Sequence, residues 1–134
     1  MRFIETLEES HLIRLHELFQ QEWWTKGRSL KDTKAAVSGS QIVLAAVEGE
    51  EVAGFVRVLT DYVFKAMIFD LIVARSFRGQ NVGQLLVEKI LEHRDLTKVR
   101  HFELYCLPEL EAYYRKLGFT EEVGGVRLMR LRAQ

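Results

Sequence analysis

The segment Arg78–Gly83 has the residue types of an anion-binding turn. It follows an apolar run that ends near Val73 and precedes a helical pattern that begins at Val82. A helix that begins there presents unpaired backbone N–H groups and the positive end of its dipole, which favour an anion. The arginine of the segment adds a charge-assisted donor, and Gly79 and Gly83 let a bulky ligand approach the backbone. The pattern predicts a strand, a phosphate-binding turn and a helix, and the alternative is a tight connection between strand and helix that binds no anion.

Asp70 is the second position that suggests chemistry. It interrupts the apolar run 66–73, where an unpaired carboxylate would be costly. Desolvation would raise the pKa of this carboxyl toward the range of a general base. The alternative is a cross-strand ion pair with Arg57, because a hairpin folded about residues 63 and 64 sets the two positions opposite each other. In either case Asp70 could help to bind a cationic amine.

Length, charge and cysteine content limit the class of protein. The 134 residues suit one domain, residues 1–134, and the 19 basic and 19 acidic side chains give no broad basic field for nucleic acid or an anionic membrane. The single cysteine, Cys106, cannot form an internal disulfide, and the four histidines show no zinc-ligand spacing. We therefore expect no bound metal. Because the N-terminus has no signal-peptide pattern, we also expect a cytoplasmic protein.

Periodicity and turn residues predict the elements that position these groups. Thr6 and Glu9 have the spacing of a capping box that opens a first helix. The residues Glu48–Glu51 predict a hairpin turn between two β-rich runs, both apolar enough for a sheet that is covered on both faces. The further helices expected are 30–37, 82–94 and 108–117, and the strands are 2–6, 41–47, 52–59, 64–73, 99–105, 119–123 and 126–131.

Two segments resemble motifs of the GNAT superfamily of acetyl-CoA-dependent N-acetyltransferases. Arg78–Gly83 is similar to the family's pyrophosphate-binding signature, with Asn81 at the position of the first signature glycine. Asparagine is the residue other than glycine that best tolerates a left-handed backbone. Tyr113–Phe119 resembles the family's closing motif. The resemblance implies an α/β GNAT fold, a mixed and mostly antiparallel central sheet flanked by helices, in the order β-α-α-β-β-β-α-β-α-β-β.

The resemblance also implies direct transfer of an acetyl group from acetyl-CoA to an amine. Tyr114 matches the position that often protonates the departing thiolate, so we expect it to be the general acid, with Asp70 as the second catalytic candidate. A backbone N–H of the strand before the turn would stabilise the oxyanion. The residues implied in cofactor binding are the strand end Leu71, Ile72 and Val73 and the turn residues Arg78, Gly79, Gln80, Asn81, Val82, Gly83 and Gln84.

The acceptor is expected to be a small amine, which Trp24 and Tyr62 could hold by cation–π attraction. Trp23 continues the apolar stripe of the first helix, which predicts a core position. Cys106 as an acyl-carrying nucleophile is disfavoured, since no histidine is placed beside it. A peptide amine as acceptor, and a non-catalytic acyl-CoA-binding or sensing domain, remain alternatives. A homodimer through contacts of the last strand is also possible.

Overall fold

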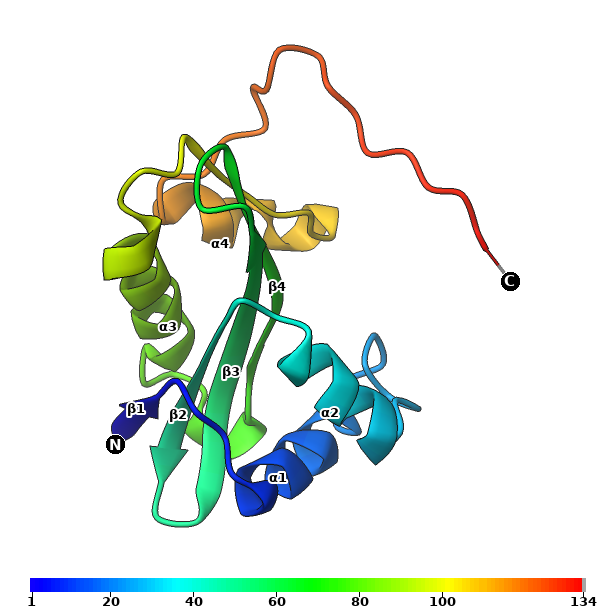
Figure 1. Ribbon diagram of the computed structural model, residues 1–134, viewed down its shortest axis with the longest axis vertical. Coiled ribbons are helices and arrows are strands. Elements are labelled where there is room, and N and C mark those ends of the chain that lie inside the picture. The colour runs from blue at the N-terminus through cyan, green and yellow to red at the C-terminus, as the bar shows by residue number, and fades with distance from the viewer. Residues whose placement is uncertain (134) are drawn as a thin grey trace. The chain divides into compact units, whose positions relative to one another are not determined.

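The computed structural model describes residues 1–133 and forms two compact units, Met1–Glu103 and Leu104–Gln134. In the first unit the elements are β1 (Arg2–Ile4), α1 (Glu9–Phe19), α2 (Leu30–Ser38), β2 (Ile42–Glu48), β3 (Glu51–Thr60), β4 (Lys65–Val73), η1 (Arg75–Phe77), α3 (Val82–Leu91), η2 (Arg94–Leu96) and β5 (His101–Glu103) (Figure 1). In the second unit they are η3 (Pro108–Leu110) and α4 (Glu111–Lys116).

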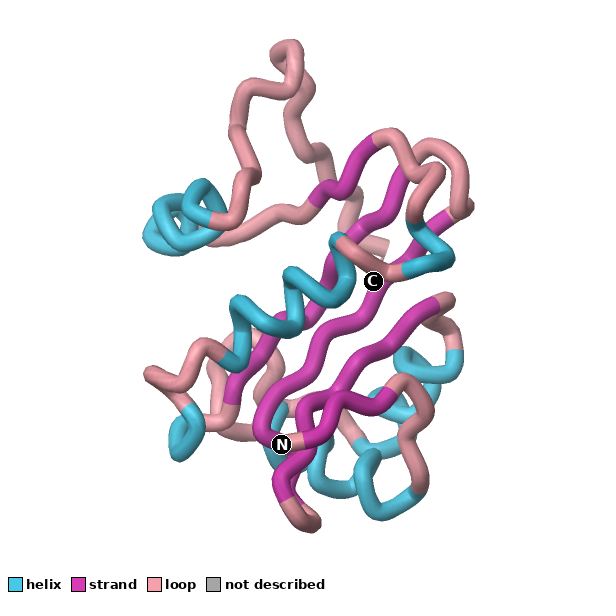
Figure 2. Tube along the Cα trace, turned by 90° about the vertical axis from the view of Figure 1, so that its left-hand side faces the viewer, coloured by secondary structure: helices cyan, strands magenta, loops and turns pink. Residues whose placement is uncertain are grey.

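The five strands form one sheet in the order β1-β2-β3-β4-β5 (Figure 2). The pairs from β1 to β4 are antiparallel, and β4 pairs with β5 in parallel. Six of the seven residues of β2 are buried, on alternate and intervening positions alike, because α1 and α2 cover one face of the sheet and α3 covers the other (Figure 1). The predicted coverage of both faces and the fold class are therefore confirmed.

A cluster of apolar side chains fixes α1 against the sheet. Leu15 and Phe19 are almost fully buried, and the ring of Phe19 meets that of Phe55 edge to face, with 6.1 Å between centroids. On the opposite face, Leu86 and Ile90 of α3 are fully buried. These two layers hold β3 and β4 between them, so the end of β4 and the start of α3 rest on a packed core.

Gly54 of β3 lets α3 approach the sheet closely. A Cβ at this position would lie 3.0 Å from the side chains of Leu86 and Val82 and 3.2 Å from the carbonyl oxygen of Ile72. A glycine inside a strand is a known sign of such a close approach. The residue therefore helps to set the position of the N-terminus of α3, although the anion turn lies more than 20 residues further along the chain.

The start and end of α1 differ from the prediction. The helix is capped by Glu8, whose side chain accepts from the backbone of His11, while Nδ1 of His11 accepts from the backbone N–H of Glu8 at 3.0 Å; Thr6 and Glu9 do not form the capping box. Because α1 ends at Phe19, Trp23 lies beyond the helix with 72% of its surface exposed. The predicted core position of Trp23 is therefore wrong.

The second unit departs from the predicted order after α4. This helix ends as expected at Gly118 (φ 100°), where the N–H of Phe119 bonds to the carbonyl of Tyr114 at 3.1 Å. The predicted strands 119–123 and 126–131 are not formed. A two-stranded hairpin alone is marginally stable, and Leu128 and Met129 break the alternation that would give such a hairpin one apolar face. The order through α4 is confirmed.

Candidate active site

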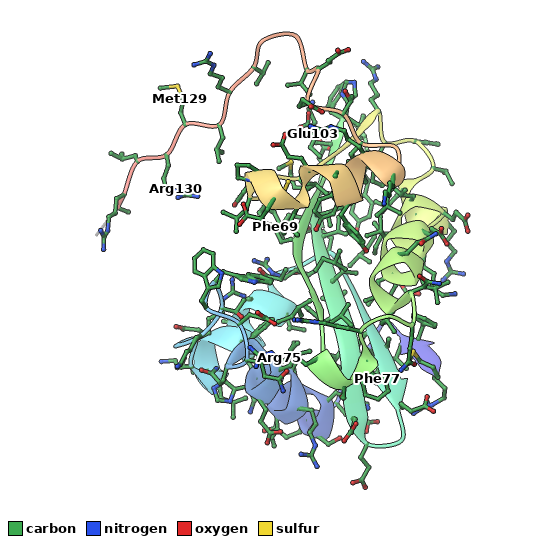
Figure 3. The ribbon with its side chains drawn as sticks, turned by 180° about the vertical axis from the view of Figure 1, so that it is seen from behind. Phe69, Arg75, Phe77, Glu103, Met129 and Arg130 are labelled. Atoms are coloured by element: carbon green, nitrogen blue, oxygen red, sulfur yellow. The ribbon has the colours of Figure 1, made fainter. Side chains whose placement is uncertain are left out.

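The turn between β4 and α3 combines a packed anchor with a left-handed backbone. Phe77 packs against the apolar cluster that contains Leu15 and Phe19 of α1. Arg75, from the same short 3₁₀ helix η1, extends toward the chain that follows α1 (Figure 3). Gly79 has φ 82° and Asn81 has φ 62°, so both lie in the left-handed region. The left-handed conformation that the sequence suggested for Asn81 is thus present, and α3 begins at Val82 as predicted.

The N-terminus of α3 is open to an anion. Asn81 is the N-cap residue, but its side chain makes no capping hydrogen bond. The first intrahelical bond runs from the N–H of Leu85 to the carbonyl of Asn81 at 3.0 Å. The N–H groups of Val82, Gly83 and Gln84 therefore have no acceptor within the helix. The side chain of Gln84 instead donates to Glu88 at 2.9 Å, so its backbone N–H is the group left for an anion at the turn.

The parallel pairing of β4 with β5 covers only the first part of β4. β5 pairs with β4 only at Lys65, Ala66 and Met67. The residues Leu71–Val73 lie beyond the end of β5, and among the described residues no strand pairs with them on that side of β4. An exposed strand edge of this kind can bind an extended ligand through main-chain hydrogen bonds. This is the stretch that the resemblance to the family assigned to the cofactor.

Asp70 lies in a bulge of β4. The register places Arg57 opposite Phe69 but Phe55 opposite Ile72, so two residues of β4 face one residue of β3. Asp70 takes up the extra residue with a left-handed backbone (φ 56°). Its carboxylate contacts Nε of Arg57 at 2.7 Å and both terminal nitrogens of Arg28 at 2.8 and 3.1 Å.

These contacts decide the protonation of Asp70. Its side chain is only 7% exposed, and burial alone raises the pKa of the carboxyl. The hydrogen bonds and charges of Arg28 and Arg57 outweigh burial and hold the pKa of Asp70 below its ordinary value of 3.8. The predicted upward shift of this pKa is therefore wrong, and the predicted ion pair with Arg57 is confirmed. With its carboxylate engaged by two guanidinium groups, Asp70 is poorly suited to accept a proton near neutral pH.

Sequence reasoning missed Arg28, which lies 42 residues before Asp70 in the chain. Its guanidinium is positioned by stacking over the ring of Phe19, 4.8 Å from the centroid, and that of Arg57 lies 5.0 Å from the centroid of Phe69. No local spacing signals a pair between elements so far apart. The only available sign was a carboxylate in an apolar run, which calls for a cation from some other element.

The connection between α1 and α2, residues 20–29, also reaches the anion turn. The carboxylate of Glu22 forms an ion pair with Arg78 and lies 3.9 Å from Nε of Arg75. A terminal nitrogen of Arg75 also donates to the carbonyl of Gln21 at 2.6 Å. Glu22 was not among the predicted site residues, yet it is the anion that contacts Arg78 in the structure.

In the second unit, Tyr114 packs between two aromatic rings. Tyr113 and Phe119 meet it edge to face, with centroid distances of 5.2 and 6.0 Å. Burial and, to a smaller extent, the neighbouring Tyr113 and Cys106 raise the pKa of Tyr114 to about 12. The phenol therefore keeps its proton throughout the neutral range and can donate it.

The surroundings of Cys106 do not favour a reactive thiolate. The thiol is free, and partial burial together with the charge of Glu111 raises its pKa above the ordinary 9.0. A thiolate is the reactive form, so this environment disfavours covalent catalysis.

The two predicted acceptor residues border opposite ends of β4. Tyr62 lies in the turn before β4 with a left-handed backbone (φ 66°), a turn in which the carboxylate of Asp61 accepts three backbone N–H bonds. Trp24 belongs to the 20–29 connection, which contacts the turn after β4. Both are partly exposed, at 41% and 39%. Their roles as acceptor-binding residues stay predictions.

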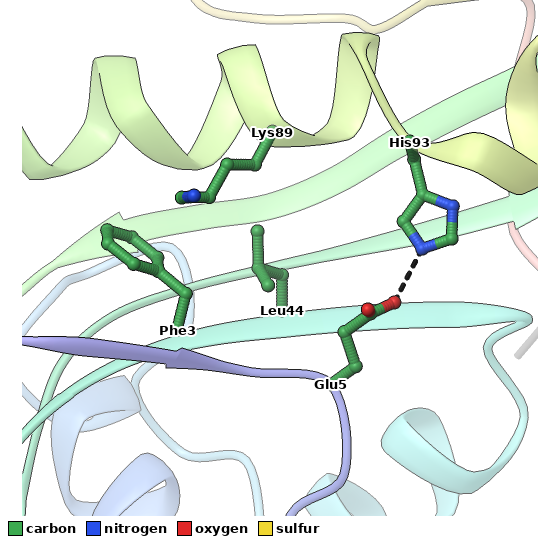
Figure 4. Close-up of a pocket in the computed structure, with 5 residues that line it drawn as sticks. All are labelled: Phe3, Glu5, Leu44, Lys89 and His93. Atoms are coloured by element: carbon green, nitrogen blue, oxygen red, sulfur yellow. Dashed lines mark hydrogen bonds and ion pairs between the residues drawn. The ribbon is translucent and has the colours of Figure 1, made fainter.

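A separate pocket lies between β1, β2 and α3 (Figure 4). Nε2 of His93 lies 2.5 Å from the carboxylate of Glu5, and Nζ of Lys89 stacks over the ring of Phe3 at 4.7 Å. Each polar side chain of the pocket therefore has a partner within it. Among the described residues, no group of three or more His, Cys, Asp or Glu side chains is placed to hold a metal ion.

Comparison with known proteins places these features in a family context. A family model described as "Acetyltransferase (GNAT) domain" matches residues 38–121. The uncharacterized N-acetyltransferase ycf52 of Pyropia yezoensis is 25% identical over 131 residues, which span 95% of this chain and 75% of that protein.

Solved structures show the same fold. A protein assigned to the GNAT family from Xanthomonas campestris pv. campestris aligns with a TM-score of 0.80 at 24% identity, over 98% of this chain and 94% of that one. A GNAT family acetyltransferase of Streptococcus pneumoniae TIGR4 aligns with a TM-score of 0.72 at 22% identity, over 97% of each chain. Among the described residues, none of the helices has the length and apolar character needed to cross a membrane.

Proposed function

This chain belongs to the GNAT acetyltransferase family and is an acetyl-CoA-dependent N-acetyltransferase, and we propose that its acceptor is a small amine. The observation that supports the proposed cofactor site is the junction of β4 and α3. There, two residues with left-handed backbones and Arg78 precede a helix N-terminus whose N-cap side chain makes no capping bond. Backbone N–H groups gathered in this way suit a diphosphate, the anionic part of the cofactor.

In the proposed complex, the backbone of residues 79–84 and the guanidinium of Arg78 hold the diphosphate. The residues Leu71–Val73, which lie beyond the end of β5, hydrogen-bond to the amides of the pantetheine arm. Acetyl-CoA supplies an acetyl group activated as a thioester. Because the contacts to the cofactor come mostly from backbone groups, they depend on the conformation of Gly79 and Asn81 more than on side-chain chemistry.

The proposed reaction is a direct transfer. The amine nitrogen attacks the thioester carbonyl carbon, a C–N bond forms and the C–S bond breaks. The nitrogen loses one proton to water, and the sulfur leaves as a thiolate that takes up a proton from water after release. Tyr114 donates a hydrogen bond to this sulfur. Since a thiol has a pKa of about 8.5, complete transfer from a phenol at about 12 is uphill by about 5 kcal/mol. The proposed contribution of Tyr114 is therefore mainly a hydrogen bond that stabilises the departing thiolate.

The proton of the amine limits the choice of acceptor. An alkyl amine of pKa about 10.4 needs about 4 to 5 kcal/mol to reach its neutral form at pH 7, whereas an α-amino group of pKa about 8 needs only about 1 kcal/mol. Asp70, with its lowered pKa and two cationic partners, does not supply the missing base. Amines that are already largely neutral at the working pH are therefore the preferred acceptors within the proposal.

The direct test is acetyl-CoA consumption across a panel of small amines whose pKa values span about 5 to 10.5. We expect the pH at which kcat/KM levels off to follow the pKa of each amine. A limb that stays at one pH for all amines would reveal a base on the enzyme and contradict this part of the proposal. A chain that binds CoA but acetylates only peptides would contradict the small-amine acceptor.

Tyr114→Phe tests the proposed donor. Turnover should fall about 100-fold, the usual effect of losing one acid or hydrogen-bond donor to a developing charge, while the Kd for CoA stays nearly unchanged. Tyr113→Phe is the matched control, since it removes the same hydroxyl from the neighbouring ring and should leave turnover within about twofold. Equal losses in both variants, or none in Tyr114→Phe, would remove Tyr114 from this role.

A further inference from the structure

Glu22 forms an ion pair with Arg78, the residue whose guanidinium the proposed function assigns to the cofactor. Its carboxylate belongs to a side chain that is 18% exposed. Arg75, whose Nε lies 3.9 Å from the same carboxylate, donates to the neighbouring Gln21 carbonyl. The guanidinium of Arg78 is the charged group that the proposed function assigns to the cofactor diphosphate. The protein therefore supplies its own anion beside the turn that would receive the cofactor.

The connection that carries Glu22 is tied together internally. The side-chain amide of Gln20 donates to the carbonyls of His16 and Arg28 at 3.1 and 3.0 Å and accepts from the N–H of Gly27 at 3.0 Å. The buried hydroxyl of Thr25 donates to the carbonyl of Phe19 at 2.7 Å. Because these bonds join its two ends, the connection can move as one piece rather than unravel.

Two close ion pairs fasten this piece to the rest of the unit, and the bond from Arg75 to the carbonyl of Gln21 adds to the second of them. One is the pair of Arg28 with Asp70 at the bulge, where the carboxylate is only 7% exposed. The other is the pair of Glu22 with Arg78, whose side chain is 52% exposed. The buried contact is the stronger of the two, since exposed ion pairs are weakened by solvent and salt. Without the Glu22 pair, the exposed guanidinium of Arg75 still holds the carbonyl of Gln21, and we expect this weaker attachment to let the connection turn about the Arg28 contact.

We propose that Glu22 is a positioning residue that occupies Arg78 until the cofactor diphosphate displaces it, and that this exchange moves the segment carrying Trp23 and Trp24. The inference rests on the proposed function for the cofactor turn. A diphosphate carries more negative charge than one carboxylate and also meets the backbone N–H groups of the turn, so it outcompetes Glu22. Cofactor binding is thereby linked to the position of a predicted acceptor residue, Trp24.

Glu22→Gln tests the competition because it removes the charge and keeps the shape. We expect the Kd for CoA, measured by calorimetry, to fall about threefold to fivefold, the range expected for release of an exposed ion pair. The Kd for pantetheine, which has no phosphate, should not change. Glu17→Gln is the matched control: Glu17 is a carboxylate of α1 that pairs with Arg14 at 3.2 Å, so the variant loses the same charge and should bind CoA like the wild type.

Placing Glu22→Gln in an Arg78→Gln background isolates the pair. There the gain in CoA affinity should disappear, since no guanidinium remains for which the two anions compete. Unchanged or weaker CoA binding by Glu22→Gln would overturn the proposal. So would an equal gain for pantetheine, or a gain that persists without Arg78.

Tryptophan fluorescence reports the movement directly, because the only two tryptophans of the chain directly follow Glu22. CoA should shift the emission of the wild type, and the free Glu22→Gln variant should already emit like the CoA-bound wild type. Emission of the free variant that matches the free wild type would show that Glu22 does not hold the segment. A wild type that fails to bind CoA at all would instead overturn the proposed function, so the two failures can be told apart.

Discussion

Two places along β4 and the turn that follows it use the same unusual backbone for different reasons. Asp70 at the bulge (φ 56°) and Asn81 before α3 (φ 62°) are both non-glycine residues in the left-handed region. The side chain of Asp70 is buried and paired with Arg57 and Arg28. Asn81 is exposed, and its side chain makes no capping bond. The bulge is thus held by side-chain charge, whereas the left-handed conformation of Asn81 is not held by a capping bond of its own side chain.

This difference shows how one strand can serve two functions. A left-handed residue costs roughly 1 to 2 kcal/mol relative to an ordinary conformation. At Asp70 the ion pairs offset this cost, and they also connect β4 to the α1–α2 connection. At Asn81 the useful product is the set of backbone N–H groups that follow without an acceptor in the helix, and a side-chain cap would occupy one of them. Substitutions should therefore act on charge at the first position and on backbone freedom at the second.

Asp70→Asn should give the largest effect, because asparagine keeps the shape and the tolerance of a left-handed backbone but removes the charge. Two guanidinium groups then lose their partner in a partly buried place, and the free energy of unfolding should fall by about 3 kcal/mol at pH 7. Urea denaturation measures this change. Asp95→Asn, at a side chain 56% exposed, is the control and should stay within about 0.5 kcal/mol.

The effect of Asp70→Asn should also depend on pH. Because the pKa of Asp70 is lowered in the folded state, the unfolded chain binds the proton at higher pH than the folded chain does. The stabilisation is therefore fully present above the ordinary value of 3.8 and is lost as the pH falls through the lower folded value. The difference between wild type and variant should narrow below that pH. A gap that stays constant down to strongly acidic pH would show that charge does not hold the bulge.

Gly54→Ala tests the packing below the turn and should have the next largest effect. The added Cβ would lie 3.0 Å from Leu86 and Val82 of α3, so the helix must shift or strain its contacts. Overpacking of this kind costs about 1 to 3 kcal/mol, and the displaced N-terminus of α3 should bind CoA more weakly. Calorimetry on the folded variant measures the affinity. An unchanged Kd would mean that the turn does not depend on how closely α3 packs.

Gly79→Ala should have a smaller effect that comes from the backbone alone. A Cβ there would meet nothing within 4 Å, but φ is 82°, so an alanine is strained by about 1 kcal/mol. Gly49→Ala in the β2–β3 hairpin is the matched control, with φ 59° and equally open space. Both variants should lose similar stability by thermal unfolding. Only Gly79→Ala should weaken CoA binding, and equal affinities would argue against the turn as the cofactor site.

The sequence alone was sufficient to predict the turn before α3. It was not sufficient to predict the bulge at Asp70 and its ion pairs. A strand end, an asparagine, two glycines and a helix start lie within a dozen residues, so local rules predicted the turn and the start of α3 at Val82. The partner of Asp70 on the α1–α2 connection lies 42 residues away, and a one-residue bulge changed the register opposite Arg57. Neither follows from local spacing, since both depend on how the helices pack on the sheet.

The predicted strands after α4 failed for a related physical reason. The residues 119–131 have β-forming side chains and a Gly124–Gly125 turn with two positive φ values, which local rules describe as a hairpin. Strand formation also needs a partner strand and one apolar face, and within residues 104–133 no other strand is present to supply them. Propensity alone therefore overestimated the strand content at this end of the chain.

The same change to glycine at Asn81 and at Asp70 compares the turn before α3 with the bulge of β4. At Asn81, glycine removes the left-handed strain and loses no side-chain bond, while the extra freedom of the unfolded chain costs about 0.5 to 1 kcal/mol. The two terms nearly cancel, so stability and the Kd for CoA should stay close to those of the wild type. At Asp70 the same relief of strain is accompanied by the loss of both ion pairs, and the variant should be destabilised by several kcal/mol, about 3 or more. If Asn81→Gly were the more damaging of the two, its side chain would have to hold the turn, and the distinction between a charge-held bulge and a backbone-held turn would fail.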